Sequence, residues 1–299
     1  MVDAVGSGDA LLRTAILDCA AFSLDSCSDL GAVCWGSDAM APITYALTLS
    51  YQGTDYAGWQ RQPNAVSVQQ RVEEALSSFL GQETRIHAAS RTDAGVHSRG
   101  QVAHLFLDRE FPAQGLQHGT NRHLPKDIRV MAAHRMSEGF HARKCARAKE
   151  YRYRILRGRV LSPLDAPFAL RVGGEIDLEA LRLATTYLLG EHDFSAFALS
   201  GGSHGQPFRT IGMAEWIARG DELELRIKGS GFLRGMVRSI VGTLLEVGGG
   251  KRDPGEIRTL LEGRPRSESG PTAAAAGLTL QHVLYPEEWQ PVATNDVLG

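Results

Sequence analysis

The chain lacks the sequence features that identify several large classes of protein. No apolar run reaches the roughly 18 residues of a membrane-spanning helix, so we expect no membrane-embedded segment. No P-loop, no dinucleotide fingerprint and no cluster of His, Cys, Asp or Glu with metal-ligand spacing occurs. We therefore expect a function that needs no nucleotide or redox cofactor and no metal.

Cysteine is scarce and unevenly placed. Three of the four cysteines lie within the first 34 residues, and only Cys145 lies in the remainder. A single cysteine cannot form an internal disulfide there, and no C-x-x-C pair occurs. A reducing, cytoplasmic compartment fits this usage best.

The two ends of the chain carry little information about the fold. Residues 1–41 have neither the basic start and apolar stretch of a secretory signal nor the Arg-rich character of a transit peptide. We expect them to be a disordered or non-essential N-terminal extension. Met40 directly precedes the first clear strand pattern, and we expect it to be the true start. Residues 287–299 are expected to form a loose tail.

The net charge of −2 hides a strong asymmetry along the chain. Residues 1–41 carry a net charge of −5 and the last nineteen residues carry −3, which leaves +6 on residues 42–280. Within that part, residues 121–159 contain twelve Lys or Arg against three acidic residues. Such a basic stripe suits a nucleic-acid phosphate backbone, although a merely solvated face would have the same composition.

Hydrophobic periodicity predicts an alternation of strands and helices. Strands are predicted at residues 43–51, 101–107 and 151–155, and a hairpin at 213–227. Helices are predicted after Ser67, Asp177 and Asp253, ending at Gly81, Gly190 and Gly263. Strand, helix, strand, strand thus appears twice, so we predict an α+β protein with domains at 42–145 and 146–286 and a site in the cleft between them.

Two charged patterns stand out within these elements. In A-S-R-T-D-A-G-V-H at 89–97, side chains two apart in extended backbone share a face, so Arg91 and Asp93 should face one cavity while Thr92 points away. Residues 232–242 are predicted to be helical, with Arg234 and Arg238 one turn apart on one face. A buried arginine on such an apolar helix needs a carboxylate partner.

Several motifs together closely resemble the tRNA pseudouridine synthases of the TruA family. These are Y-Q-G-T-D-Y-A-G-W-Q at 51–60, R-T-D-A-G-V-H at 91–97, N-R-H-L-P-K-D-I at 121–128, F-H-A-R at 140–143 and L-R-G-M-V-R-S-I-V-G at 233–242. Two positions depart from the family pattern: Gln52 replaces an acidic residue, and Ser90 stands where the catalytic loop usually has glycine.

The resemblance implies a fold, a reaction and a partner. The pseudouridine synthase fold has two related α/β halves, with antiparallel or mixed sheets, joined across a central basic cleft. Its members are homodimers that isomerise uridine to pseudouridine in tRNA without a cofactor. For this family the targets lie in the anticodon arm, at or near positions 38–40, so tRNA is the partner we expect.

The resemblance also assigns roles to individual residues. Asp93 becomes the catalytic carboxylate, Arg238 its ion-pair partner, Tyr151 the residue that stacks on the target nucleotide and Arg91 the residue that holds the base out. Desolvation would raise the pKa of Asp93, whereas Arg238 favours the ionised form, and we expect a carboxylate at neutral pH. The basic stripe supplies candidate contacts to the RNA backbone: Arg143, Lys144, Arg147, Lys149 and Arg152.

Some alternatives stay open at this point. The aspartate could attack the ribose, attack the base, or remove a sugar proton to give a glycal. A non-catalytic RNA-binding protein would keep the basic stripe but would not need Asp93 paired with Arg238, and a hydrolase would want a second acidic group or an activated nucleophile. His87, His97 and His104 have no ligand spacing and are interpreted as structural or RNA-facing.

Overall fold

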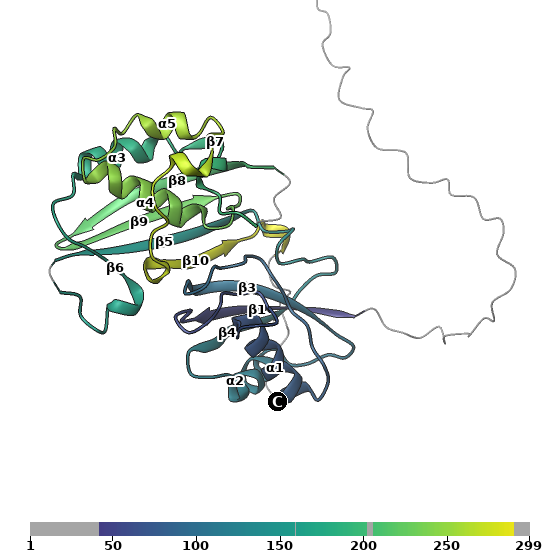
Figure 1. The fold of residues 1–299 in the computed structure, drawn as a ribbon. Coiled ribbons are helices and arrows are strands. Elements are labelled where there is room, and N and C mark those ends of the chain that lie inside the picture. Colours follow the sequence, from purple (N-terminus) through teal and green to yellow (C-terminus); the bar gives the residue numbers. More distant parts are fainter. Residues whose placement is uncertain (1–41, 159, 202–205, 290–299) are drawn as a thin grey trace, which may run out of the picture. The chain divides into compact units, whose positions relative to one another are not determined.

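One mixed sheet of ten strands runs through this computed structural model, which describes residues 42–158, 160–201 and 206–289 (Figure 1). The predicted extension at 1–41 lies outside the described residues, as does most of the predicted tail. Glu287–Trp289 are described and form a short 3-10 helix, η5, in which Trp289 contacts the ring of Phe140. The expectation of a loose tail stays a prediction.

The N-terminal half contributes strands β4, β1 and β3, in that order and all antiparallel. Alternate residues of β1 (Tyr45, Leu47 and Leu49) are buried in its core, as the sequence pattern predicts. The elements along the chain are β1 (Ile43–Tyr51), α1 (Val68–Leu80), β2 (His87–Ala88), β3 (His97–Leu107), α2 (Ala113–His123) and β4 (Ile128–Arg135).

The C-terminal half contributes strands β10, β5, β9, β8 and β7, in that order and all antiparallel. Its core is separate and packs α3, α4 and α5 against the sheet (Figure 1). The elements are β5 (Ala148–Arg157), η1 (Ala166–Phe168), β6 (Leu170–Val172), α3 (Leu178–Thr186), β7 (Gly190–Asp193), η2 (Ser195–Phe197), β8 (Phe208–Arg219), β9 (Glu222–Gly229), α4 (Met236–Gly248), α5 (Glu256–Leu260), η3 (Arg266–Glu268), η4 (Ala275–Gly277) and β10 (Leu278–Leu284).

The two halves join where β10 pairs in parallel with β3, through Thr279 opposite His97 and Leu280 opposite Ser98. Parallel strands begin at the same edge of a sheet, so the segments that precede them lie side by side. The segments here are residues 89–96 and 271–277. This seam therefore brings the predicted catalytic loop against a segment that is far away in sequence. The predicted domain boundary at 145/146 falls in the connection between β4 and β5 and stays a prediction.

Helix caps account for several correct boundaries. Ser67 Oγ accepts the N–H of Gln70 at 3.2 Å at the start of α1, and Gly81 ends it with φ of +72°. Asp177 Oδ1 accepts the N–H of Ala180 at 2.9 Å at the start of α3. Side-chain caps of this kind satisfy the otherwise unpaired first N–H groups of a helix.

Other boundaries differ from the prediction. Helix α4 begins at Met236, after Gly235 takes φ of +68°, so Arg234 lies in the preceding turn and not one helical turn from Arg238. Helix α3 ends at Thr186, because the chain turns and enters edge strand β7 at Gly190. Helix α5 begins at Glu256, two residues beyond Pro254.

Helix α2 was not predicted at all. Its sequence, A-Q-G-L-Q-H-G-T-N-R-H, has two glycines and one large apolar residue, Leu116, which is fully buried. Gly119 is required by packing, because a Cβ at this position would lie 2.1 Å from the Phe79 ring of α1. Tertiary contact with α1 thus stabilises a segment whose own helix propensity is poor.

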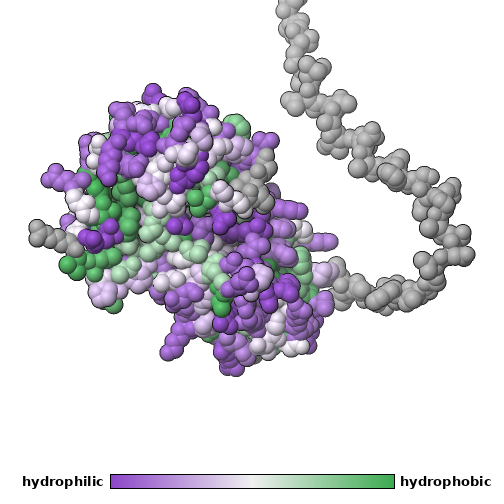
Figure 2. Space-filling view, in the orientation of Figure 1, coloured by the Kyte–Doolittle hydropathy of each residue, from purple (hydrophilic) through white to green (hydrophobic). Residues whose placement is uncertain are grey.

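The surface seen in Figure 2 is mainly hydrophilic, with an apolar area over the sheet of the C-terminal half. Val160 and Leu164, in the connection after β5, are the most exposed large apolar side chains among the described residues, at 88% and 85%. Side chains this exposed contribute nothing to the two cores.

Candidate active site

Asp93 lies on a tight loop, residues 89–96, directly before β3 at the seam. The N–H of Val96 donates to the carbonyl of Asp93 at 3.1 Å, and Gly95 between them has φ of +77°. That left-handed conformation is strained for residues with a Cβ, which explains the glycine. The turn ends the loop immediately after the carboxylate.

Arg91, Thr92 and Asp93 all line a common cavity. The Thr92 hydroxyl also lies 2.8 Å from the buried Tyr51 hydroxyl. Thr92 therefore anchors the loop to the N-terminal core.

The loop is also held from behind by the motif at 51–60. Trp59 N–H donates to the Thr92 carbonyl at 3.0 Å. A Cβ on Gly58 would lie 2.7 Å from that carbonyl oxygen, and a Cβ on Gly53 would lie 2.0 Å from the Val96 oxygen. Both glycines are needed because backbone packs directly on backbone here. The first motif thus supports the loop rather than supplying its chemistry.

Asp93 and Arg238 form an ion pair. Arg238 Nη1 lies 3.5 Å from Asp93 Oδ2, and the two side chains are 18% (Arg238) and 20% (Asp93) exposed. Arg238 Nε donates to the carbonyl of Ala273 at 2.8 Å, and the Ala273 N–H donates back to the Arg238 carbonyl at 3.0 Å. The guanidinium is therefore fixed by the backbone of the 271–277 segment as well as by the aspartate.

Tyr151 lines the same cavity from β5. Its hydroxyl lies 2.8 Å from Ser90 Oγ, and its ring meets the edge of Phe232 with centroids 5.0 Å apart. Burial raises the pKa of Tyr151 to about 12, so the phenol keeps its proton. Ser90 is itself clamped by Gln101, which accepts from the Ser90 N–H at 3.2 Å and donates to its carbonyl at 2.8 Å.

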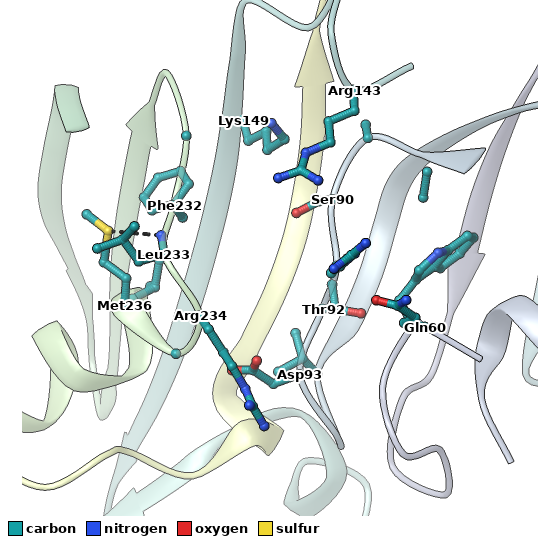
Figure 3. A pocket seen from close by; sticks show the side chains of 18 of the residues that line it. Gln60, Ser90, Thr92, Asp93, Arg143, Lys149, Phe232, Leu233, Arg234 and Met236 are labelled. Atoms are coloured by element: carbon teal, nitrogen blue, oxygen red, sulfur yellow. Dashed lines mark hydrogen bonds between the residues drawn. The ribbon is translucent and has the colours of Figure 1, made fainter. Parts of the chain in front are cut away.

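These residues surround a cavity of about 1320 Å³ over the seam (Figure 3). Among the described residues that line it, Asp93 is the only carboxylate. Seven lining residues are Lys or Arg: Arg61, Arg91, Arg143, Lys149, Arg209, Arg234 and Arg238. A concave wall with this excess of one sign raises the local concentration of anions.

Proteins similar in sequence to this chain are named for one activity. A family model described as tRNA pseudouridine synthase matches residues 48–143 and 184–286. The chain is 46% identical over 239 residues to the tRNA pseudouridine synthase A of Syntrophotalea carbinolica, covering 80% of this chain and 95% of that protein. It is 45% identical over 242 residues to that of Geobacter sp. strain M21, covering 81% and 98%. The chain belongs to the tRNA pseudouridine synthase family.

The resemblance drawn from the motifs is thereby confirmed, and so is the mixed α/β fold with a basic cleft. A solved structure of a Cbf5-Nop10-Gar1 complex matches 68% of this chain and 54% of that chain, with 11% identity and a TM-score of 0.28. That likeness is too low to support an argument.

The cations predicted to bind RNA in this pseudouridine synthase fall into separate groups. Arg143 and Lys149 line the cavity, whereas Lys144 and Arg147 are exposed and are not among its lining residues. Arg152 lies on the opposite face of β5 and pairs with the buried Glu224 at 3.5 Å. The structure therefore brings two of the five to the site.

His97 has a structural role in the synthase. The Gly53 N–H donates to its Nδ1 at 3.0 Å, so Nε2 carries the proton and donates to the Pro167 carbonyl at 2.7 Å. Burial lowers the pKa of His97, which keeps this tautomer neutral. The ring thus ties the start of β3 to both halves.

His87, His104 and His141 form a cluster that the sequence did not reveal. The His104 ring lies 5.1 Å from His87 and 4.5 Å from His141, centroid to centroid. His87 and His141 line the cavity, and the buried His104 accepts the Ala142 N–H at 3.2 Å. Positions 87, 104 and 141 are far apart in the sequence and form no recognisable motif, so only the fold shows that these side chains meet.

Three further features of the site were missed from sequence. Arg209, in the stretch F-R-T at 208–210, was given no role from sequence. Phe232 contacts Tyr151 from the turn before α4, which had been predicted to be helix. The carbonyl of Ala273, which accepts from Arg238, belongs to the backbone. Its role therefore could not be predicted from the type of residue at position 273.

No group of His, Cys, Asp or Glu within the described ranges could hold a metal ion. In the same part of the chain, every helix is too short or too polar to span a membrane.

Proposed function

We propose that this chain converts uridine to pseudouridine in the anticodon arm of tRNA, at or near positions 38–40, with Asp93 as the catalytic carboxylate. Membership of the family makes the chain an isomerase that acts on tRNA. The observation that supports the role of Asp93 is its position as the one carboxylate among the described cavity residues, paired with Arg238.

The reaction breaks the glycosidic bond between N1 of uridine and the ribose, rotates the detached uracil and joins its C5 to the ribose. C5 then loses its proton and N1 takes one up. No oxidation or reduction occurs, so one positioned carboxylate can catalyse all steps of the reaction. Attack on the ribose, attack on the base and formation of a glycal all begin from the same ionised group. Arg238 lies 3.5 Å from that carboxylate and is itself held by the Ala273 contacts, so the pair has a fixed direction.

The target nucleotide has to leave its helix first, at a cost of a few kcal/mol. We propose that Arg91, which is exposed at the cavity, occupies the place that the nucleotide leaves in the helix. Tyr151 then stacks on the extruded nucleotide. Tyr151 lines the cavity, is 5% exposed, and is held in one orientation by Ser90 and Phe232. A fixed surface lowers the entropy cost of ordering the nucleotide.

We also propose that the enzyme works as a homodimer in the cytoplasm, as the resemblance implies. Val160 and Leu164 are the exposed apolar side chains whose burial would favour a second copy. The reducing compartment is supported by the single cysteine, Cys145, in the described part of the chain.

The test is tritium release from tRNA that carries 5-tritiated uridine. Asp93→Asn keeps the size of the side chain but removes the carboxylate charge, so we expect tRNA binding without measurable release. Asp108→Asn makes the same chemical change at an exposed position outside the cavity and should release tritium at the wild-type rate.

Release by Asp93→Asn at the wild-type rate would overturn the assignment of Asp93. Binding of tRNA by the wild type with no release from a complete tRNA pool would leave an RNA-binding protein and overturn the proposed activity.

A further inference from the structure

One wall of the cavity concentrates positive charge without any acidic partner. Lys149 is only 8% exposed, yet no carboxylate of the described residues forms an ion pair with it. Arg143 and Arg209 line the same wall, and neither forms an ion pair with a described acidic residue. In Figure 3 the side chains of Arg143 and Lys149 extend into the same part of the cavity.

A buried ammonium without a counter-charge is costly, so such a group normally pairs or loses its proton. Burial, followed by the charges of Arg143 and Arg209, lowers the pKa of Lys149 to about 8. Burial also lowers the pKa of Arg209, and the charge of Arg143 lowers it further. The three cations therefore repel one another when no anion lies between them.

The protein holds these cations in place despite that repulsion. The loop that carries Arg143 is fixed at Ala142, whose N–H donates to His104 Nδ1 at 3.2 Å and whose carbonyl accepts from the Tyr285 hydroxyl at 2.7 Å. Lys149 lies inside β5, paired with β9 and β10. Arg209 donates to the carbonyl of Gln206 at 2.8 Å. A site this fixed needs little reorganisation to receive an anion.

We propose that Arg143, Lys149 and Arg209 together bind one phosphate of the RNA backbone, the phosphate next to the nucleotide that contacts Tyr151. Lys149 and Tyr151 lie two residues apart on the same face of β5, a distance of about 7 Å along the strand. That distance is close to the length of one backbone unit of RNA. The inference rests on the proposed function, because Tyr151 places the target nucleotide.

The test compares Lys149→Met with Lys251→Met, which removes the same charge from an exposed position outside the cavity and outside the basic stripe. Binding of unmodified tRNA is measured over a range of salt concentrations. We expect Lys149→Met to bind about tenfold more weakly or worse at low salt, the loss expected for one charged contact. The slope of its affinity against salt concentration should fall by the contribution of about one phosphate contact, whereas Lys251→Met should keep the wild-type slope.

Stability separates this outcome from misfolding. Lys149→Met removes an unpaired buried charge, so its urea midpoint should equal or exceed that of the wild type. Arg143→Met changes an exposed side chain and provides a second, independent test. We expect it to lose as much tRNA affinity as Lys149→Met, and its affinity to depend less on salt by the same amount. Wild-type affinity and slope in both variants would overturn the phosphate site.

The two proposals fail separately. If the wild type binds tRNA and never releases tritium, the synthase assignment fails while the binding result still decides the phosphate site. If the wild type releases tritium and the Lys149 and Arg143 variants bind normally, the activity stands and the phosphate site fails.

Discussion

At the scale of single residues, the contact between Ser90 and Tyr151 changes how the site is understood. From sequence, Ser90 was only a departure from the family's glycine. In the structure its hydroxyl is the hydrogen-bond partner of the buried Tyr151 hydroxyl, at 2.8 Å. A glycine at position 90 would leave that hydroxyl without this partner, and a buried unpaired hydroxyl is costly.

We therefore predict that Ser90→Ala lowers the free energy of unfolding by about 1 kcal/mol. In a double-mutant cycle with Tyr151→Phe, the coupling should be about 0.5 to 1.5 kcal/mol, because either change alone breaks the same bond. Urea denaturation of the four proteins measures it. Strictly additive single effects would contradict the contact.

Residue-level prediction succeeded where charge logic applied. A buried arginine requires a carboxylate, and Arg238 indeed meets Asp93. The same logic could have separated Lys149 from Lys144, because Lys149 continues the alternation of Tyr151 and Tyr153 on the buried face of β5. Arg238 also donates to the backbone carbonyl of Ala273. This contact could not be predicted from sequence, because every residue has the same backbone carbonyl.

At the scale of elements, the glycines of the 51–60 motif explain why that stretch accompanies the catalytic loop. Gly58 has φ of +91°, and its Cα packs against the carbonyl of Thr92, one residue before Asp93. Any side chain at position 58 must push the loop, because the obstacle is backbone and not the end of a flexible side chain.

Gly58→Ala should therefore lower tritium release by about tenfold or more, since small displacements of a reacting group have large effects on rate. Gly81→Ala is the matched control. Gly81 also has positive φ, +72°, but nothing lies within 4 Å of its added Cβ. It should cost about 1 kcal/mol of stability with wild-type release. Equal loss of release in the two variants would argue against a role for the Thr92 contact.

Element prediction from sequence worked where local signals were strong. The sequence of strand β1 alternates large apolar or aromatic residues with small or hydroxyl residues, and α1 carries both a serine cap and a terminal glycine. It failed where the deciding contact is distant, because α2 depends on packing against Phe79. It also failed at Gly235, where a turn delays the start of the helix predicted at residues 232–242 to Met236.

At the scale of the whole molecule, buried histidines set a limit on acid stability. His104 is 1% exposed, and burial, followed by the charges of His141 and His87, lowers its pKa to about 4. In the unfolded chain a histidine takes up its proton near pH 6.5. Between these values the unfolded state binds more protons, so stability falls as the pH falls from about 6.5 to about 4.

The expected loss is at most about 3.5 kcal/mol, at about 1.4 kcal/mol for each pKa unit. Urea denaturation at pH 7.5, 6 and 5 measures it. In His104→Asn, which has an oxygen that can still accept the Ala142 N–H, stability should fall less over the same range. An equally steep fall in the variant would assign the acid sensitivity to other groups.

The two-part plan of the molecule was accessible from sequence, since each half has its own pattern of apolar residues and its own core. The union of both halves in one sheet was not. Strand β10 has an ordinary local pattern, and its partners, β3 and β5, lie about 180 and 130 residues earlier in the chain. Sequence periodicity identifies a strand but does not identify its neighbours.

The position of β10 also determines when the protein becomes functional during synthesis. The last strand of the described chain occupies the middle of the sheet, so β3 and β5 present open edges until residues 278–284 have left the ribosome. The carbonyl of Ala273, which fixes Arg238, also emerges late. A nascent chain therefore has Asp93 and Tyr151 but no closed cavity around them, and folding must finish before RNA can be held there.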